Sequence, residues 1–359
     1  MASRIRNRNL LLTLCCCFLV IVLGCVDDET VFVMDAGKVG ESPSVEYAPL
    51  ATFAAMTIPA DNPISSAKVD LGRQLFFDAR LSGDGALSCY SCHLNEKGLS
   101  DGRSTAVGAF EKALTRNSPT LWNIGYHHTW YWDGRADSLE GQALAAWKGG
   151  NMGAANYEEI VAALNGIEEY RQQFQAVFGE DATADNVPKA LASYMRTIVS
   201  GSTPWDTWQA GDDSAISEAA KRGAEVFKKA NCENCHSGVL FTDLQFHNVG
   251  IGMDAADPDV GRFTVTEIEM DMGAFKTPTL RDVSDSAPYF HNGSVATLED
   301  AVRIMVNGGI ANDYLDSTNL QPAGLTEEEI SDLVEFLKAL DEPTELEIPT
   351  VPGMEGISE

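Results

Sequence analysis

Two short stretches decide the fold of this chain: CYSCH at residues 89–93 and CENCH at residues 232–236. Both fit the pattern C-x-x-C-H, in which two thiols one helical turn apart can add to the two vinyl groups of a haem. The imidazole that follows the second thiol then faces the iron. The residues concerned are Cys89, Cys92 and His93 in the first stretch and Cys232, Cys235 and His236 in the second.

Two other kinds of site use closely spaced cysteines. A zinc site needs four ligands in a closed tetrahedron, and a thioredoxin-like redox pair gives no reason for a histidine in the next position twice. The sequence therefore predicts two covalently bound c-type haems, one at each motif.

The N-terminus has the pattern of a bacterial export signal. Three arginines precede an apolar run at residues 10–23, which is shorter than the roughly 20 residues that cross a membrane. The run ends in VLGC at residues 22–25, which resembles a lipobox. We expect residues 1–24 to be a signal peptide and Cys25 to carry a lipid. A plain secretory signal and an uncleaved anchor are the alternatives. The predicted location is the periplasmic side, as a lipoprotein attached to the membrane through its lipid anchor alone.

Charge narrows the range of partners. The 359 residues carry a formal net charge of −28. Nucleic acid is excluded as the expected partner, because phosphate binding needs an excess of Lys and Arg. An acidic surface favours a basic protein partner instead.

The chain between the signal and the last residues contains an internal repeat. LGRQLFF at residues 71–77 precedes the first motif, and RGAEVF at residues 222–227 precedes the second. We predict a mainly α-helical fold of two cytochrome c-like domains in tandem, each with one covalent haem. The expected boundaries are a tether at 25–66, an N-terminal haem domain at 67–204, a C-terminal haem domain at 205–341 and an acidic tail at 342–359.

Helical periodicity is the dominant local pattern. Apolar residues recur at i, i+3, i+4 and i+7 over residues 157–164 and again over 187–198. Thr297 and Thr326 each precede an acidic residue three positions later, which is typical of a helix N-terminus. Alternating strand patterns are few.

Several further stretches point to a known family. They are LFFDARLS at 75–82, RNSPT at 116–120, WDGRA at 132–136, FKTPTLR at 275–281 and APYFH at 287–291. In this order around two C-x-x-C-H motifs, they resemble the bacterial di-haem cytochrome c peroxidase family, which includes the MauG-type enzymes. The resemblance covers about residues 67–341.

The resemblance implies different roles for the two haems. The N-terminal haem reacts with peroxide, and the six-coordinate C-terminal haem receives electrons from a small cytochrome c or a cupredoxin. Met305 matches the distal ligand of the C-terminal haem, where MauG-type enzymes carry tyrosine. Trp132 matches the tryptophan between the haems. Asn117, Ser286 and Pro288 match the ligands of an inter-haem calcium ion, for which oxygen ligands are suitable.

Two positions depart from the family pattern. Ala109 stands where many members have a histidine ligand to the N-terminal haem, so we expect that haem to be five-coordinate. Asn151 stands where the family has a catalytic glutamate, near Gln142, which matches the family glutamine. An amide cannot carry a proton in its ordinary range. Either another carboxylate serves, with Glu111 and Glu140 as candidates, or peroxide turnover is slow.

These observations predict an enzyme, a di-haem cytochrome c peroxidase that reduces hydrogen peroxide to water. Its catalytic candidates are Trp132, Gln142 and Asn151. The alternatives are a MauG-like oxidase that modifies a protein partner and a di-haem electron carrier or redox sensor without enzymatic activity. Because family members are often dimers, the resemblance also suggests a homodimer.

Overall fold

The computed structural model describes residues 53–341 and 344–354. The predicted signal peptide, Cys25, residues 25–52 of the predicted tether and parts of the predicted tail lie outside the described residues. Within the described ranges, no helix is both long and apolar enough to cross a membrane.

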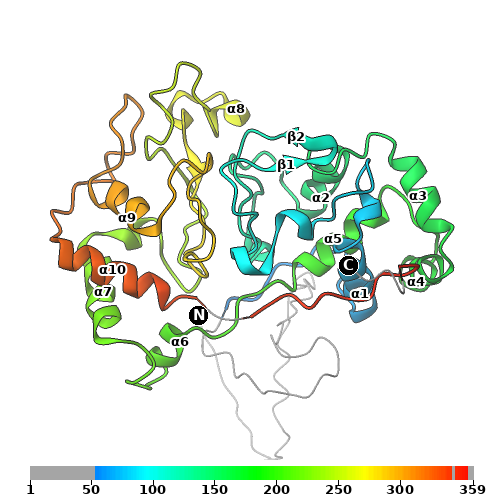
Figure 1. Cartoon of the computed structure of the whole chain (residues 1–359), viewed down its shortest axis with the longest axis horizontal. Helices are drawn as coiled ribbons and strands as arrows, with labels where there is room; N and C mark the ends of the chain where they lie inside the picture. Colours follow the sequence, from blue (N-terminus) through cyan, green and yellow to red (C-terminus); the bar gives the residue numbers. More distant parts are fainter. Residues whose placement is uncertain (1–52, 342–343, 355–359) are drawn as a thin grey trace, which may run out of the picture. The chain divides into compact units, whose positions relative to one another are not determined.

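Helices dominate the described chain (Figure 1). The N-terminal half contains α1 (Ser66–Phe76), α2 (Leu139–Lys148), α3 (Tyr157–Asn165), α4 (Glu168–Phe178) and α5 (Asn186–Met195). The C-terminal half contains α6 (Pro204–Gln209), α7 (Glu218–Lys229), α8 (Phe263–Thr266), α9 (Leu298–Val306) and α10 (Glu327–Lys338). The helix expected from the periodicity at 157–164 is confirmed as α3, and the one expected at 187–198 is confirmed as α5 as far as Met195, where the helix ends.

Strands are limited to two short antiparallel pairs. β1 (Val107–Gly108) pairs with β2 (Lys112–Ala113), and β3 (Phe246–His247) pairs with β4 (Phe275–Lys276). All four strands lie on chain segments between helices, so they shape loops rather than form a sheet core.

The sequence repeat corresponds to a repeated helix crossing. In the N-terminal half α1 packs on α5, and in the C-terminal half α7 packs on α10. A glycine lies at each crossing: a Cβ added at Gly72 would lie 2.0 Å from the carbonyl oxygen of Ala190, and one at Gly223 would lie 1.9 Å from that of Asp332. Only a residue without a side chain allows this approach. The repeated glycine therefore explains why the same pattern precedes both motifs.

Each half has its own hydrophobic core. Leu75, Phe76 and Trp147 belong to the first core, and Phe227 and Phe336 belong to the second. Both helix N-termini expected from threonine are confirmed, since Thr297 accepts from the Asp300 N–H and Thr326 forms a reciprocal capping box with Glu329. These caps fix the start of α9, which carries Met305, and of α10.

The described end of the predicted tether is part of the fold. Met56 is buried, and the fully buried Asn62 amide donates to Glu140 Oε1 at 2.6 Å and to the Lys189 carbonyl at 3.0 Å. Met56 and Asn62 therefore fix this segment against the helices, so residues 53–65 are not a free tether.

The C-terminal segment 344–354 returns to the N-terminal half. The Asn95 side chain donates to the Leu346 carbonyl at 3.0 Å and accepts from the Leu346 N–H at 2.8 Å. Arg80 donates to the Pro352 carbonyl at 2.6 Å, and Leu346 and Val351 pack on the first hydrophobic core. This part of the expected acidic tail thus packs against the first domain, although it follows the second domain in sequence.

Candidate functional site: two haem-type cavities

The first motif lies at the wall of a large cavity. A single turn of 3₁₀ helix at Tyr90–Cys92 separates the two thiols, and Cys89, Cys92 and His93 all line a cavity of about 540 Å³. His93 Nδ1 lies 2.8 Å from the Leu99 carbonyl oxygen. Because a carbonyl can only accept, Nδ1 carries the proton and Nε2 is left to bind a metal.

The second motif repeats this arrangement. Cys232–Asn234 form the 3₁₀ turn, and Cys232, Cys235 and His236 line a second cavity of about 210 Å³. His236 Nδ1 lies 3.0 Å from the Phe241 carbonyl oxygen. Burial lowers the pKa of both His93 and His236, so both imidazoles stay neutral and available as ligands.

The two carbonyls that orient the histidines come from strained residues. Leu99 has φ of 57° and Phe241 has φ of 50°, in the left-handed region that non-glycine residues rarely adopt. Both side chains are buried in their domains. Packing of these apolar side chains thus holds a backbone conformation that aims each carbonyl at a ligand histidine.

The donor set fits covalent haem at both motifs, where burial disfavours the thiolate form of three of the four cysteines. Burial raises the pKa of Cys89 and of Cys232 to about 12, and that of Cys92 to about 11. Zinc ligation and dithiol redox chemistry both require thiolates. Burial of Cys89, Cys92 and Cys232 disfavours the thiolate form of these residues. A c-type haem requires two thiols on one turn, a neutral imidazole and an adjoining cavity, and each motif provides all three.

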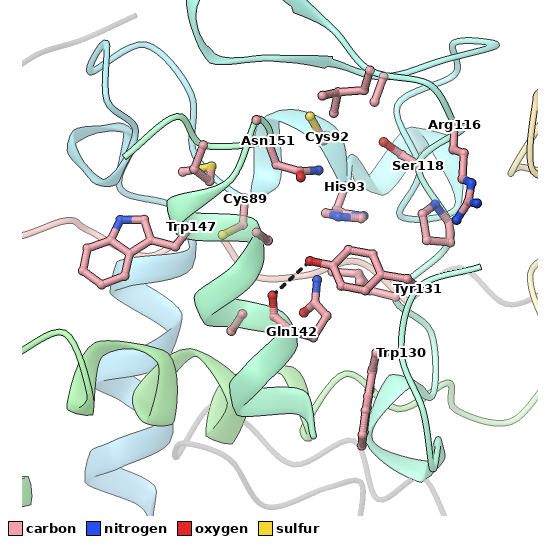
Figure 2. A pocket seen from close by; sticks show the side chains of 18 of the residues that line it. Cys89, Cys92, His93, Arg116, Ser118, Trp130, Tyr131, Gln142, Trp147 and Asn151 are labelled. Carbon is pink, nitrogen blue, oxygen red and sulfur yellow. Dashed lines mark hydrogen bonds between the residues drawn. The ribbon is translucent and has the colours of Figure 1, made fainter. Parts of the chain in front are cut away.

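Gln142 and Asn151 meet at the first cavity, as predicted. Gln142 projects from α2 and Asn151 from the loop that follows it, and both side chains are seen with His93 in Figure 2. Among the described residues that line this cavity, His93 is the only histidine. Two methionines, Met152 and Met195, also line it. Ala109 is buried outside the lining, where its N–H donates to the Asn151 carbonyl at 2.9 Å.

Neither candidate carboxylate enters the first cavity. Glu140 faces away from it and is held by Arg196 at 2.6 and 3.0 Å and by the Asn62 amide at 2.6 Å. Arg196 and Asn62 lower the pKa of Glu140 despite its partial burial, so it is a structural anion. Glu111 is exposed and does not line the cavity. The suggestion that one of them replaces the family glutamate is therefore not supported.

Met305 is placed at the second cavity, and its role as an iron ligand stays a prediction. It projects from α9 and lines the second cavity together with His236. His247 and His291 line the same cavity, but both are engaged elsewhere. His247 lies between Asp316 at 2.6 Å and Asp243 at 3.0 Å, and His291 stacks on Phe275 with ring centroids 3.6 Å apart.

Trp132 connects the two cavities. It lines the first cavity, the second cavity and a smaller one of about 90 Å³. Its indole N–H donates to the Asn117 carbonyl at 3.0 Å, and its own carbonyl accepts from the Lys276 N–H at 2.8 Å. One rigidly held aromatic ring thus borders both haem-type cavities, as the sequence suggested.

The three predicted calcium ligands also meet. Asn117, Ser286 and Pro288 all line the 90 Å³ cavity. The Asn117 amide nitrogen donates to the Arg103 carbonyl at 2.8 Å and to the Pro288 carbonyl at 3.3 Å. In this arrangement the Asn117 amide nitrogen, not its oxygen, faces the carbonyls, and Lys276 also lines the cavity, so calcium binding stays a prediction.

Sequence reasoning missed two features of the site. Lys276 is a buried amine that donates to the Thr129 carbonyl at 2.6 Å and contacts His127 Nδ1 at 3.1 Å, and burial lowers its pKa to about 7. Tyr131 is the second feature, a phenol that lines the first cavity beside Trp132. The aromatic run Trp130, Tyr131 and Trp132 was the available signal, but of these only Trp132 belongs to the motif that carried the resemblance.

Fold and site together define a di-haem c-type cytochrome. A family model for di-haem cytochrome c peroxidase matches residues 66–214, and a cytochrome c model matches residues 220–341. The chain is 39% identical over 343 residues to cytochrome-c peroxidase IdrP1 of Denitromonas iodatirespirans, covering 86% of this chain and 91% of the relative. It is 40% identical over 300 residues to the methylamine utilization protein MauG of Methylorubrum extorquens, covering 82% and 84%.

A solved structure agrees with these matches. The crystal structure of a MauG-like protein associated with microbial copper homeostasis aligns with a TM-score of 0.72 and 33% identity, covering 84% of this chain and 95% of the other. The chain belongs to the di-haem cytochrome c peroxidase and MauG family. The predicted fold of two cytochrome c-type domains is thereby confirmed, and family membership implies two covalent haems.

Proposed function

We propose that this chain is a peroxidase that reduces hydrogen peroxide to water with two electrons from a small redox protein. The observation that carries the proposal is that the two cavities, both bordered by Trp132, differ in the polar side chains that line them. Amide side chains, Gln142 and Asn151, line the first cavity, whereas the thioether of Met305 lies with His236 in the second. Amide groups can hydrogen-bond a small substrate, and a methionine able to complete the coordination of a bound haem would suit electron transfer.

The residues divide the work as follows. Haems held by His93 and His236 would supply the redox chemistry at peroxide and the entry point for electrons, respectively. Met305 raises the potential of the electron-entry centre, Trp132 lies on the route between the centres, and Gln142 orients the substrate. Cytochrome-c peroxidase IdrP1, at 39% identity, supports this assignment.

A basic cytochrome c or a cupredoxin is the electron donor that the charge favours. The chain carries a net charge of −28, so complementary charge would speed encounter and salt would slow it. The proposal also includes a calcium ion bound by Asn117, Ser286 and Pro288. It further includes a periplasmic location, with the protein anchored as a lipoprotein through Cys25. A homodimer remains part of it on the family resemblance alone.

A MauG-like oxidase is the second candidate. It is favoured by the 40% identity to MauG of Methylorubrum extorquens and by the MauG-like solved structure. The methionine at position 305, where the resemblance gives MauG-type enzymes a tyrosine, favours the peroxidase.

One assay separates the candidates. The holoprotein is mixed with hydrogen peroxide, with and without a reduced small cytochrome c, and oxidation of the donor is followed by its absorbance. Turnover that depends on the donor supports the peroxidase. A change in the haem spectrum that persists without donor supports the oxidase, and the absence of any reaction supports a carrier or sensor.

A further inference from the structure

The first cavity needs a group that can deliver a proton, and the usual carboxylate position holds Asn151. Apart from the motif residues Cys89, Cys92 and His93, the titratable side chains that line this cavity are Lys112, Arg116, Tyr131, Asp133 and Arg135. Arginine keeps its proton at any working pH. The single carboxylate among them, Asp133, is paired with Arg116 at 2.7 Å and Arg135 at 3.0 Å. Tyr131 and Lys112 are therefore the groups left to consider.

Tyr131 is held rigidly with its hydroxyl in the cavity. Its backbone has φ of 68°, a conformation that an aromatic residue adopts only when its surroundings impose it. The Arg135 guanidinium lies 3.5 Å from the centre of the phenol ring. Figure 2 shows the hydroxyl directed at α2, where it donates to the Gln142 backbone carbonyl over 3.3 Å.

This long hydrogen bond leaves the phenol able to change partner. At 3.3 Å the bond is beyond the usual range for an O–H donor, so a substrate oxygen can compete for the proton. Burial raises the pKa of Tyr131, which keeps the phenol protonated at neutral pH. Lys112, in contrast, is exposed on β2 at the edge of the cavity.

We propose that the Tyr131 hydroxyl is the proton donor of the first cavity, acting on peroxide held beside Gln142. This inference rests on the proposed peroxidase function. The balanced reaction is H₂O₂ + 2 e⁻ + 2 H⁺ → 2 H₂O. The O–O bond breaks as two electrons arrive from the donor protein, and the departing oxygen leaves as water with the Tyr131 proton. Solvent supplies the second proton and then restores the phenol.

Arg135 has a defined part in this step. When Tyr131 gives up its proton, a phenolate forms directly beneath a guanidinium 3.5 Å from the ring centre. The cation stabilises the phenolate through its charge. Arg135 is therefore a positioning and charge-balancing residue, which does not itself transfer a proton.

The test uses three variants of the di-haem holoprotein. Tyr131→Phe removes one oxygen, Lys112→Met removes the alternative donor, and Tyr126→Phe is the matched control because Tyr126 is half-buried outside the cavity lining. The rate of reaction with stoichiometric hydrogen peroxide is measured by rapid mixing. We expect Tyr131→Phe to lower the rate about 100-fold, at the lower end of what a general acid contributes. The other two variants should react within about twofold of the wild-type rate.

A second readout does not depend on turnover. Fluoride bound to a ferric haem accepts hydrogen bonds but receives no electrons, so its dissociation constant reports the donor alone. We expect Tyr131→Phe to raise that constant about tenfold, as the loss of one hydrogen bond to an anion predicts. Haem content and thermal unfolding of each variant confirm that the fold is retained.

Three results would overturn the assignment: a wild-type peroxide rate in Tyr131→Phe, an unchanged fluoride constant in that variant, or loss of rate in Lys112→Met instead. If the wild-type holoprotein leaves peroxide intact, the proposed function fails, and the fluoride titration then decides the role of Tyr131 by itself.

Discussion

Asn151 is the residue that most limits the expected chemistry. It lines the first cavity at the position to which the family resemblance assigns a glutamate, and neither Glu111 nor Glu140 enters that cavity. Asn151→Glu should raise the rate of reaction with peroxide by about 10- to 100-fold, because a second proton carrier would then face the substrate. The rate is measured by rapid mixing at pH 7.

A matched substitution serves as the control. Asn156→Glu adds the same charge at an exposed position nearby, outside the cavity lining, and should leave the rate unchanged. If Asn151→Glu also reacts at the wild-type rate, proton delivery is not what limits the reaction.

Met305 is the second residue with a direct spectroscopic consequence. The account predicts one high-spin and one low-spin ferric signal in the electron paramagnetic resonance spectrum of the holoprotein as isolated. Met305→Ala should remove the low-spin signal and lower the midpoint potential of the second haem by about 0.1 V, since a thioether ligand raises that potential.

The control for this experiment is Met270→Ala, which alters a methionine that is 83% exposed and should change neither property. Two low-spin signals in the wild type would mean that the first haem carries a protein ligand, for which Met152 and Met195 are the nearest thioethers in the cavity lining.

At the scale of elements, a partly buried acid follows the end of α10. Asp341 follows the helix and is bonded to the Ser284 hydroxyl and, at 3.3 Å, to the Ser284 N–H. Burial raises the pKa of Asp341 to about 6, above the ordinary value of about 3.9 for an aspartate. Between these two pH values the native protein therefore holds a proton that the unfolded chain has released. Asp341 thus lowers the free energy of unfolding as pH rises through this window.

Asp341→Asn should therefore stabilise the protein at neutral pH. The amide stays neutral at every pH, so its advantage is largest above pH 6, on the order of 2 kcal/mol, and disappears below about pH 4. Urea unfolding at pH 4.5 and pH 7.5 measures the difference. An equal effect at both pH values would show that Asp341 does not titrate as described.

The elements also show how far sequence reasoning could reach. The two motifs identified His93 and His236, because covalent attachment fixes the spacing of thiols and imidazole. The glycines at 72 and 223 mark the two repeated helix crossings, because close backbone approach excludes every other residue.

Other features of the structure could not be predicted from local sequence patterns. The left-handed backbone at Leu99 and Tyr131 is imposed by tertiary packing, and propensity alone gives no sign of it. The pairing of Glu140 with Arg196 spans 56 positions, so sequence could not show that this carboxylate is turned away from the cavity. The packing of residues 344–354 on the N-terminal half was likewise missed, because this segment has no periodic pattern.

At the scale of the molecule, this C-terminal segment joins the second domain to the loop that orients His93. Asn95 forms both hydrogen bonds to Leu346 and lies in the loop between His93 and Leu99. Asn95→Ala should lower the free energy of unfolding by about 1–2 kcal/mol, as expected for the loss of two hydrogen bonds. Thermal unfolding of the holoprotein measures this.

Gln172→Ala is the comparison variant, since it removes an exposed amide on α4 that donates to Glu168 and should leave the melting temperature within about 1 °C. Equal melting temperatures for Asn95→Ala and the wild type would indicate that the segment contributes nothing to stability.

The two domains also contact each other directly around Trp132. Arg116 donates to Asp259 at 2.6 and 2.8 Å while it holds Asp133 at 2.7 Å, and the Asn117 N–H donates to the His291 carbonyl at 2.7 Å. These bonds fix the segment that carries the aromatic ring between the cavities.

The most direct test of this account is the number of electrons consumed per peroxide. The holoprotein is given limiting hydrogen peroxide and an excess of a reduced, basic small cytochrome c, and the oxidised donor is counted by absorbance. The account predicts two donor molecules oxidised for each peroxide, with no oxygen released. Peroxide loss without donor oxidation, or no peroxide loss at all, would contradict it.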